Sequence, residues 1–265
     1  MRGSYYVLTA SLLWAHPGLA ATNFNDLQAR LRIPFAAASI VDASGQRPDV
    51  ILIQDIHRHP QAQENIRTMI LSAMASTGAK EIFLEGSWTH GQTADYSYMG
   101  IEDADTYKAN VEAFDAVEKN REGAMQELET ASLFGDAFDA PSADSLKRVK
   151  RLIQLRLKPA EYAEYLKSPF RASTRSQLAD AVTAAEHFYE IANERSHIFL
   201  KNAKALHKEG PQVMVVGGFH TAAMTDELHR QGISYVVLSP HVSQGGFDGL
   251  YAQGMHDTIS ALKLH

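Results

Sequence analysis

The sequence contains no cysteine, and this absence sets the first limit on its chemistry. Disulfide bonds and thiolate metal sites are excluded, so any metal ligands have to be nitrogen or oxygen atoms. The body of the chain has no apolar run long enough to span a bilayer. The HExxH, Walker A and GxSxG motifs are also absent. Nothing therefore indicates a zincin, a P-loop nucleotide site or a serine hydrolase.

A surplus of basic residues is lacking as well. The chain has 25 Lys and Arg against 31 Asp and Glu, which gives a net charge of -6. Because binding of nucleic acid needs a basic face, a nucleic-acid partner is not expected. What remains is an ordinary globular composition, with 45% apolar and 21% charged residues in 265 positions. This length suits one α/β domain with a sizeable core.

The first 20 residues have the pattern of a signal peptide. Arg2 precedes an apolar stretch over 5–14, and Gly18 and Ala20 stand where a signal peptidase reads small residues. A short buried strand or helix is the alternative interpretation. We therefore expect residues 1–20 to be removed, residues 21–265 to form the mature domain, and the protein to be periplasmic or secreted.

Two stretches of the chain predict βαβ units. Residues 50–56 (VILIQDI) form a near-continuous apolar run, which is typical of a buried parallel strand. A helical pattern follows from Pro60 to Gly78, and a second strand is expected over 81–84. The same order returns with a strand over 213–216, a helix over 221–230 and a strand over 233–238. The sequence thus predicts an α/β fold whose central, mostly parallel sheet is built from two βαβ units and is flanked and capped by helices.

The middle of the chain has helical spacing of its apolar residues. This pattern covers residues 106–134, 144–157 and 173–209. We expect a helical insertion over about 105–209 that covers the sheet or caps the site, with enough apolar surface for a homodimer. A last helix over 251–264 is an open alternative to a loop.

Four polar residues follow the predicted strands. Asp55 and His57 close the first strand, Glu85 closes the second, and His220 follows the third. Ligands of open α/β sheets bind outside the carboxyl ends of the strands, so these side chains are expected to share one rim. They could hold a divalent metal, or one histidine could act as a general base without metal. Asp55 has a simpler alternative role as a helix cap.

Other residues support this rim. Glu85 ends an apolar strand and needs a partner, because an unpaired buried carboxylate is costly. Arg195 of the long helix is a candidate for a structural salt bridge to it. Gly217 and Gly218 let the backbone approach a ligand or cofactor closely. Glu102 is a further candidate at the end of a short strand, with a helix-capping role as the alternative.

These motifs resemble those of known proteins. The segments QDIH at 54–57, LEG at 84–86 and GGFHT at 217–221 resemble a bacterial family with the same motifs. More distantly, residues 33–240 are similar to the TIKI/TraB/ChaN/erythromycin-esterase superfamily. Its pattern is a GxxH, a strand-terminal Glu, an Arg in a late helix and a second GxxH. The resemblance implies a site made of His57, Glu85, Arg195 and His220. Gln54 stands where the first GxxH has glycine.

The superfamily includes metal-dependent proteases, metal-free esterases and a haem-binding lipoprotein. The resemblance therefore implies a secreted or periplasmic hydrolase of an amide or ester bond, acting on a small molecule or a peptide. Arg195 would steady Glu85 or an oxyanion. A haem- or iron-binding protein of the ChaN-like type is the first alternative, and a non-catalytic structural or interaction protein is the second. A Mn or Zn ion, if it is used, would have its candidate ligands in His57, Glu85, His220, Asp55 and Glu102.

Overall fold

The computed structural model describes residues 23–134, 142–171, 176–243 and 250–263. The predicted signal peptide, residues 1–20, lies outside this part of the chain. The strands are β1 (Ala38–Ser44), β2 (Val50–Asp55), β3 (Glu81–Leu84), β4 (His90–Gln92), β5 (Ser97–Gly100), β6 (Gln212–Gly217) and β7 (Tyr235–Pro240). The helices are α1 (Phe24–Arg30), α2 (Pro60–Thr77), α3 (Ala104–Phe134), α4 (Ala143–Ile153), α5 (Pro159–Lys167), α6 (Gln177–Leu206), α7 (His220–Arg230) and α8 (Leu250–Lys263).

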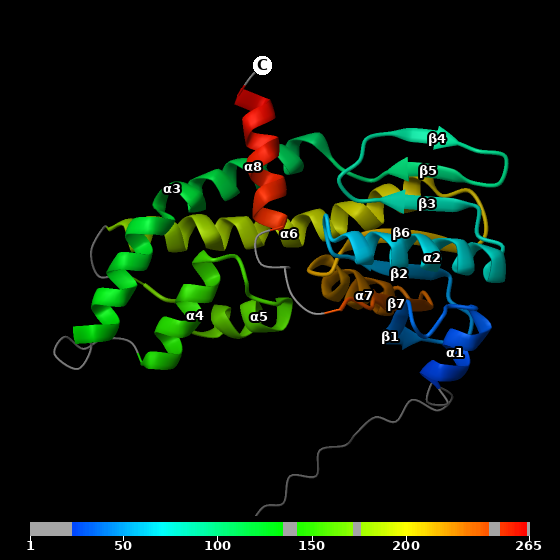
Figure 1. Ribbon diagram of the computed structural model, residues 1–265, viewed down its shortest axis with the longest axis horizontal. Helices are drawn as coiled ribbons and strands as arrows, with labels where there is room; N and C mark the ends of the chain where they lie inside the picture. Colours follow the sequence, from blue (N-terminus) through cyan, green and yellow to red (C-terminus); the bar gives the residue numbers. More distant parts are fainter. Residues whose placement is uncertain (1–22, 135–141, 172–175, 244–249, 264–265) are drawn as a thin grey trace, which may run out of the picture.

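The seven strands form one sheet in the order β1-β7-β2-β6-β3-β5-β4 (Figure 1). The five central strands run parallel, whereas β1 and β4 are antiparallel strands at the two edges. The predicted α/β fold with a mostly parallel sheet is thus confirmed. The sequence did not predict the edge strands β1 and β4.

The two βαβ units interleave in the sheet. Strand β6 lies between β2 and β3 of the first unit, and β2 lies between β6 and β7 of the second. Asp55 at the end of β2 is therefore in register with Gly217 at the end of β6, and Leu84 of β3 pairs with Val215. This interleaving brings the carboxyl ends of β2, β6 and β3 side by side, and with them the polar residues that follow each strand.

Helices cover both faces of the sheet. The side chains of Ile51 and Ile53 pack with α1 and α2 on one face, whereas Leu52 and Met214 pack with α6 and α7 on the other. Both faces of β2 are buried, as expected for a central parallel strand. Helix α2 begins at Pro60 and ends at Gly78, whose φ of 76° suits a left-handed cap.

A separate apolar cluster joins α3, α4, α5, α6 and α8. Helix α3 covers the predicted stretch 106–134, and α6 covers 177–206 of the predicted stretch 173–209, whose first residues lie outside the described part of the chain. The predicted stretch 144–157 ends early. Helix α4 stops at Ile153, Leu155 has a φ of 54°, and Lys158 is extended because Pro159 follows it. The short helix α5 begins at this proline and was not predicted. Within the described part of the chain, no helix is long and apolar enough to cross a membrane.

Candidate functional site

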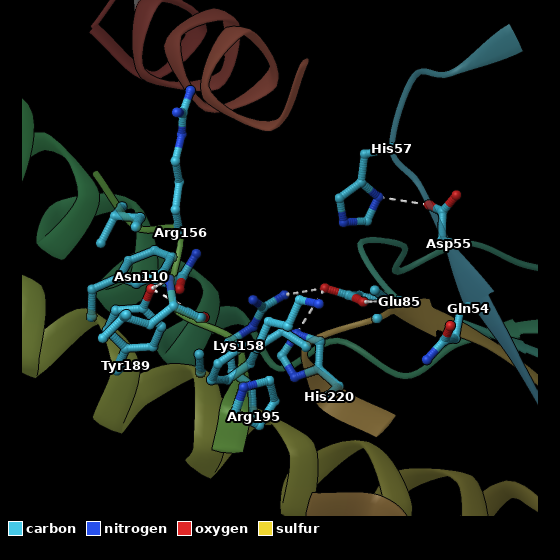
Figure 2. Close-up of a pocket in the computed structure, with 18 residues that line it drawn as sticks. Gln54, Asp55, His57, Glu85, Asn110, Arg156, Lys158, Tyr189, Arg195 and His220 are labelled. Atoms are coloured by element: carbon cyan, nitrogen blue, oxygen red, sulfur yellow. Dashed lines mark hydrogen bonds and ion pairs between the residues drawn. The ribbon is translucent and has the colours of Figure 1, made fainter. Parts of the chain in front are cut away.

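A cavity of about 570 Å³ lies where the carboxyl ends of β2, β3 and β6 meet the helices (Figure 2). Strands and helices far apart in the sequence contribute to its wall, because the linker after α4 and the middle of α6 close it from the side opposite the sheet. The predicted site residues that line it are Asp55, His57, Glu85, Arg195, Gly217, Gly218 and His220. Glu102 does not line it.

His57 and Asp55 form a tight pair at the end of β2. The distance from His57 Nδ1 to Asp55 Oδ2 is 2.6 Å, and Asp55 Oδ1 accepts a hydrogen bond of 2.7 Å from Gln63 Nε2. Gln63 thus holds the Asp55 carboxylate in place, and Asp55 in turn orients the imidazole ring of His57. The ring faces Glu85 (Figure 2). About a third of the His57 side chain is exposed (34%), and the residue lines the cavity.

The surroundings of His57 favour its protonated form. Burial lowers the pKa of the imidazole, but the hydrogen bond to Asp55 and the negative charge of Glu85 outweigh burial. The net effect raises the pKa of His57 above its ordinary value of about 6.5. A histidine whose pKa lies near the working pH is suited to accept a proton as a general base.

Glu85 is a buried carboxylate at the centre of the rim. Its Oε2 accepts a hydrogen bond of 2.5 Å from the backbone N of Gly217, and its Oε1 lies 3.2 Å from an Arg195 nitrogen and 3.2 Å from His220 Nε2. Burial raises its pKa, but His220, Arg195 and His57 together hold the pKa of Glu85 far below its usual range. Glu85 therefore stays ionised and anchors its neighbours rather than donating a proton.

The guanidinium group of Arg195 is bound by the carboxylate of Glu102. Its Nε lies 3.0 Å from Glu102 Oε1 and its terminal nitrogen 2.8 Å from Oε2, and Glu102 also accepts from the backbone N of Gly86. The Glu102 side chain is fully buried (0% exposed). Its role is to hold the arginine toward the cavity, and the helix-capping role falls instead to Asp103, which accepts from the N of Thr106.

His220 is fixed through a serine that sequence reasoning missed. Ser196 Oγ donates to the carbonyl of Ala192, and His220 Nδ1 lies 2.9 Å from the same Oγ. With Nε2 facing Glu85, both ring nitrogens of His220 meet partners within the protein. The only signal for Ser196 in the sequence is its place beside Arg195 in the long helix.

Gln54 takes a definite place in the structure. Its Nε2 donates to Thr221 Oγ1 at 3.0 Å, and this hydroxyl donates to the carbonyl of Gly218 at 2.8 Å. The residue that departs from the GxxH pattern thus ties the first motif, at the end of β2, to the second, at the end of β6.

The polar side chains of this rim contact one another rather than a common point. Both oxygens of Glu85 accept hydrogen bonds, the Arg195 cation lies against it, and His220 faces the same carboxylate rather than open space. Across the described ranges, no three His, Asp or Glu side chains form a group that could hold an ion. The Mn or Zn ion predicted from the sequence stays a prediction.

The cavity wall contains side chains of the kinds that ligate haem iron. Axial ligation needs a histidine or tyrosine side chain directed at the iron. The hydroxyl of Tyr189 accepts from the backbone N of Leu157 and donates to its carbonyl oxygen, so the backbone already holds it. His57 also lines the cavity and is held by Asp55 through Nδ1, an arrangement that a haem-ligating histidine can share.

Gly217 offers a direct test of how tightly the rim is built. A Cβ at this position would lie 3.3 Å from both Glu85 Oε2 and His57 Nε2, closer than side chains normally pack. At Gly218 the nearest atoms, of Gln54, are 3.9 Å away. We expect Gly217→Ala to lower the kcat/KM of the activity proposed below by about tenfold to a hundredfold by displacing these groups. Gly218→Ala, the matched control, should change it by no more than about twofold; equal kcat/KM in both variants would contradict this packing.

The wall opposite His57 is built from the linker and α6. Apolar side chains of Leu155, Leu157, Phe188 and Phe219 share it with the cations Arg156 and Lys158. Sequence reasoning did not place these residues at the site, because the linker's turn after α4 has no clear sequence signal.

Comparisons with the patterns of known protein families, with curated proteins and with solved structures found no match to this chain.

Proposed function

We propose that the protein hydrolyses a carboxylic ester or amide without a metal ion, with His57 as the general base. The observation that carries this proposal is the His57–Asp55 pair, which lines a cavity that Arg195 also lines. The cavity of about 570 Å³ has the size of a small-molecule pocket. The resemblance to a superfamily that includes metal-free esterases supports the reaction class, and the signal-peptide pattern extends the proposal to a periplasmic or secreted enzyme.

The reaction follows from the placement of these groups. A water molecule beside His57 loses a proton to Nε2 while its oxygen bonds to the substrate carbonyl carbon. Asp55 keeps the Nδ1–H oriented and stabilises the imidazolium that forms. Negative charge grows on the carbonyl oxygen, where the Arg195 cation at the same rim favours it. When the carbon–oxygen or carbon–nitrogen bond breaks, His57 returns the proton to the leaving group.

Glu85 and Glu102 act by positioning in this scheme. Glu102 orients Arg195 with two hydrogen bonds, and Glu85 joins Arg195, His220 and the backbone of Gly217 into one unit. A rigid set of charges needs little rearrangement when the transition state forms, and this preorganisation is what lowers the barrier.

The proposal is tested with two chromogenic substrates, 4-nitrophenyl hexanoate and the corresponding hexanoyl 4-nitroanilide. Turnover of either by the chelator-treated protein supports it. Turnover that appears only after Mn²⁺ or Zn²⁺ is added would replace it with the metal-dependent alternative. A Soret band on titration with haem, without turnover, would replace it with the haem-binding alternative.

The pH dependence gives a further prediction. Because His57 works in its neutral form and its pKa is raised, kcat/KM should rise with pH along a limb whose midpoint lies above about 6.5. Asp55→Asn removes the hydrogen bond and charge that raise this pKa, so the limb should move to lower pH. The plateau should also fall by at least about tenfold, since the ring loses its orienting partner. A limb that stays at the same pH in Asp55→Asn would contradict the assignment.

A further inference from the structure

Gln54 is a polar residue of the cavity wall to which the proposed hydrolysis gives no role. It stands near the end of β2, at the position where the GxxH pattern has glycine. Side chains alternate between the two faces of a sheet, and Leu52, two residues earlier, packs with α6 and α7. Gln54 therefore points to that face, where it is half-buried and lines the cavity. Figure 2 shows it on the same side of the cavity as Asp55 and Glu85.

The hydrogen bonds of Thr221 determine which way the Gln54 amide is turned. The Thr221 hydroxyl has a single proton, which it donates to the carbonyl of Gly218 at 2.8 Å. Its Oγ1 is then an acceptor toward Gln54, so the amide atom 3.0 Å away is the nitrogen Nε2. Thr221 is buried in the first turn of α7 and holds the amide on a rigid element. The oxygen Oε1 of Gln54 is thus turned away from Thr221.

The amide oxygen of Gln54 is left as a hydrogen-bond acceptor for a ligand. Within the described ranges of the chain, no residue donates a hydrogen bond to Oε1. The atom is not sealed in the protein interior either. The neighbouring carboxylates of Asp55 and Glu85, by contrast, accept hydrogen bonds from groups of the protein. A ligand that enters beside Gln54 therefore meets a neutral acceptor in a fixed orientation.

The Gln54 amide also lies close to the group that we assign as the general base. A Cβ on Gly218 would be 3.9 Å from the amide carbon and nitrogen of Gln54, and a Cβ on Gly217 would be 3.3 Å from His57 Nε2. The amide and the imidazole thus lie beside two consecutive residues, whose Cα atoms are about 3.8 Å apart. A substrate whose carbonyl lies at His57 would reach Gln54 with an atom only a few bonds away from that carbonyl.

We propose that Gln54 selects substrates that carry a hydroxyl group on the acyl chain, one or two carbons from the scissile carbonyl. The hydroxyl donates its proton to Gln54 Oε1. The reaction of this substrate rests on the proposed hydrolysis, whereas the binding of a hydroxyl donor by Gln54 does not. A chain without a donor displaces water from Oε1 and leaves the oxygen unpaired, and such a loss is what lets a polar site reject an analogue strongly.

The test compares the 4-nitrophenyl esters of 2-hydroxyhexanoic and 3-hydroxyhexanoic acid with those of the matching methoxy acids, which cannot donate a hydrogen bond. We expect kcat/KM of at least one hydroxy ester to exceed that of its methoxy partner by at least about tenfold. Gln54→Met removes the acceptor but keeps the length of the side chain, so this ratio should fall close to one. Thr221→Val frees the amide to turn and should lower the ratio as well.

Gln231 supplies the matched control, because it is an exposed glutamine after α7 that does not line the cavity. Gln231→Met should keep the ratio of the wild-type protein. Equal kcat/KM for the hydroxy and methoxy esters of both pairs would overturn the inference. A wild-type ratio that persists in Gln54→Met and in Thr221→Val would overturn it too, because the size of the methoxy group would then explain the preference.

A binding measurement separates this inference from the proposed function. Calorimetric titration of the full chain uses 3-hydroxyheptan-2-one and 4-hydroxyheptan-2-one, with heptan-2-one as the match that lacks a donor, and these ketones cannot be hydrolysed. Tighter binding of a hydroxy ketone that is lost in Gln54→Met, without hydrolysis of any ester, would retain the hydroxyl site and overturn the proposed function. Hydrolysis of all the esters at equal kcat/KM within each pair, with the hydroxy ketones bound no tighter than heptan-2-one, would overturn the hydroxyl site and retain the proposed function.

Discussion

Replacement of His57 by glutamine is expected to lower kcat/KM for ester hydrolysis by about 10³-fold. A general base that is correctly placed contributes roughly 10²–10⁴-fold to a reaction rate, and glutamine cannot accept the proton. The side chain is about a third exposed (34%), so the substitution should leave the fold intact. The measurement is the initial rate of 4-nitrophenyl hexanoate hydrolysis, with circular dichroism as the check on folding.

His187 supplies the matched control for this variant. It lies on α6 with 62% of its side chain exposed, and it does not line the cavity. His187→Gln should retain the full rate. If His57→Gln kept more than about a tenth of the wild-type rate, His57 would not be the general base.

Replacement of Arg195 by methionine is expected to lower the free energy of unfolding by about 3–5 kcal/mol. The arginine is 5% exposed and neutralises Glu102, which is fully buried, and Glu85, which is 8% exposed. Removal of one partner from a buried ion pair leaves the other charge uncompensated, which is the costly case. Urea unfolding followed by circular dichroism measures the loss.

The control for this prediction is an ion pair whose arginine is exposed. Arg171, 66% exposed, contacts Glu186 at 2.7 Å, and Arg171→Met should change the unfolding free energy by no more than about 1 kcal/mol. Glu102→Gln combined with Arg195→Met should cost less than the sum of the two single variants, because the buried charge of Glu102 is then gone. A loss at Arg195→Met as small as that at Arg171→Met would show that the buried cluster does not stabilise the fold.

The sequence was sufficient to predict the strands that form the rim. The apolar run at 50–56 and the shorter ones at 81–84 and 213–216 are typical of strands in a buried sheet, and each is followed by a polar residue of the site, His57, Glu85 or His220. The strand order was not predictable, because it depends on which strands pair in three dimensions. Because β6 lies between β2 and β3, the residues that follow these three strands, His57, Glu85 and His220, line the same cavity.

The chemistry of the site was harder to predict than its position. Histidine and glutamate serve equally well as metal ligands and as acid–base groups, so their residue types leave both options open. The contacts of Glu85 with Arg195 and His220 favour the second option, and they depend on where α6 crosses the strand ends. Ser196 and Lys158 went unnoticed for the same reason, since helix packing and the turn after α4 bring them to the site.

The central claim is that His57 performs hydrolysis without a metal ion. Its most direct test is the rate of 4-nitrophenyl hexanoate hydrolysis at pH 8 by chelator-treated protein, with the metal content of the same sample determined by mass spectrometry. We expect a rate that is unchanged by chelation in the wild-type protein and about 10³-fold lower in His57→Gln. A rate that disappears on chelation and returns with Mn²⁺ or Zn²⁺ would contradict it.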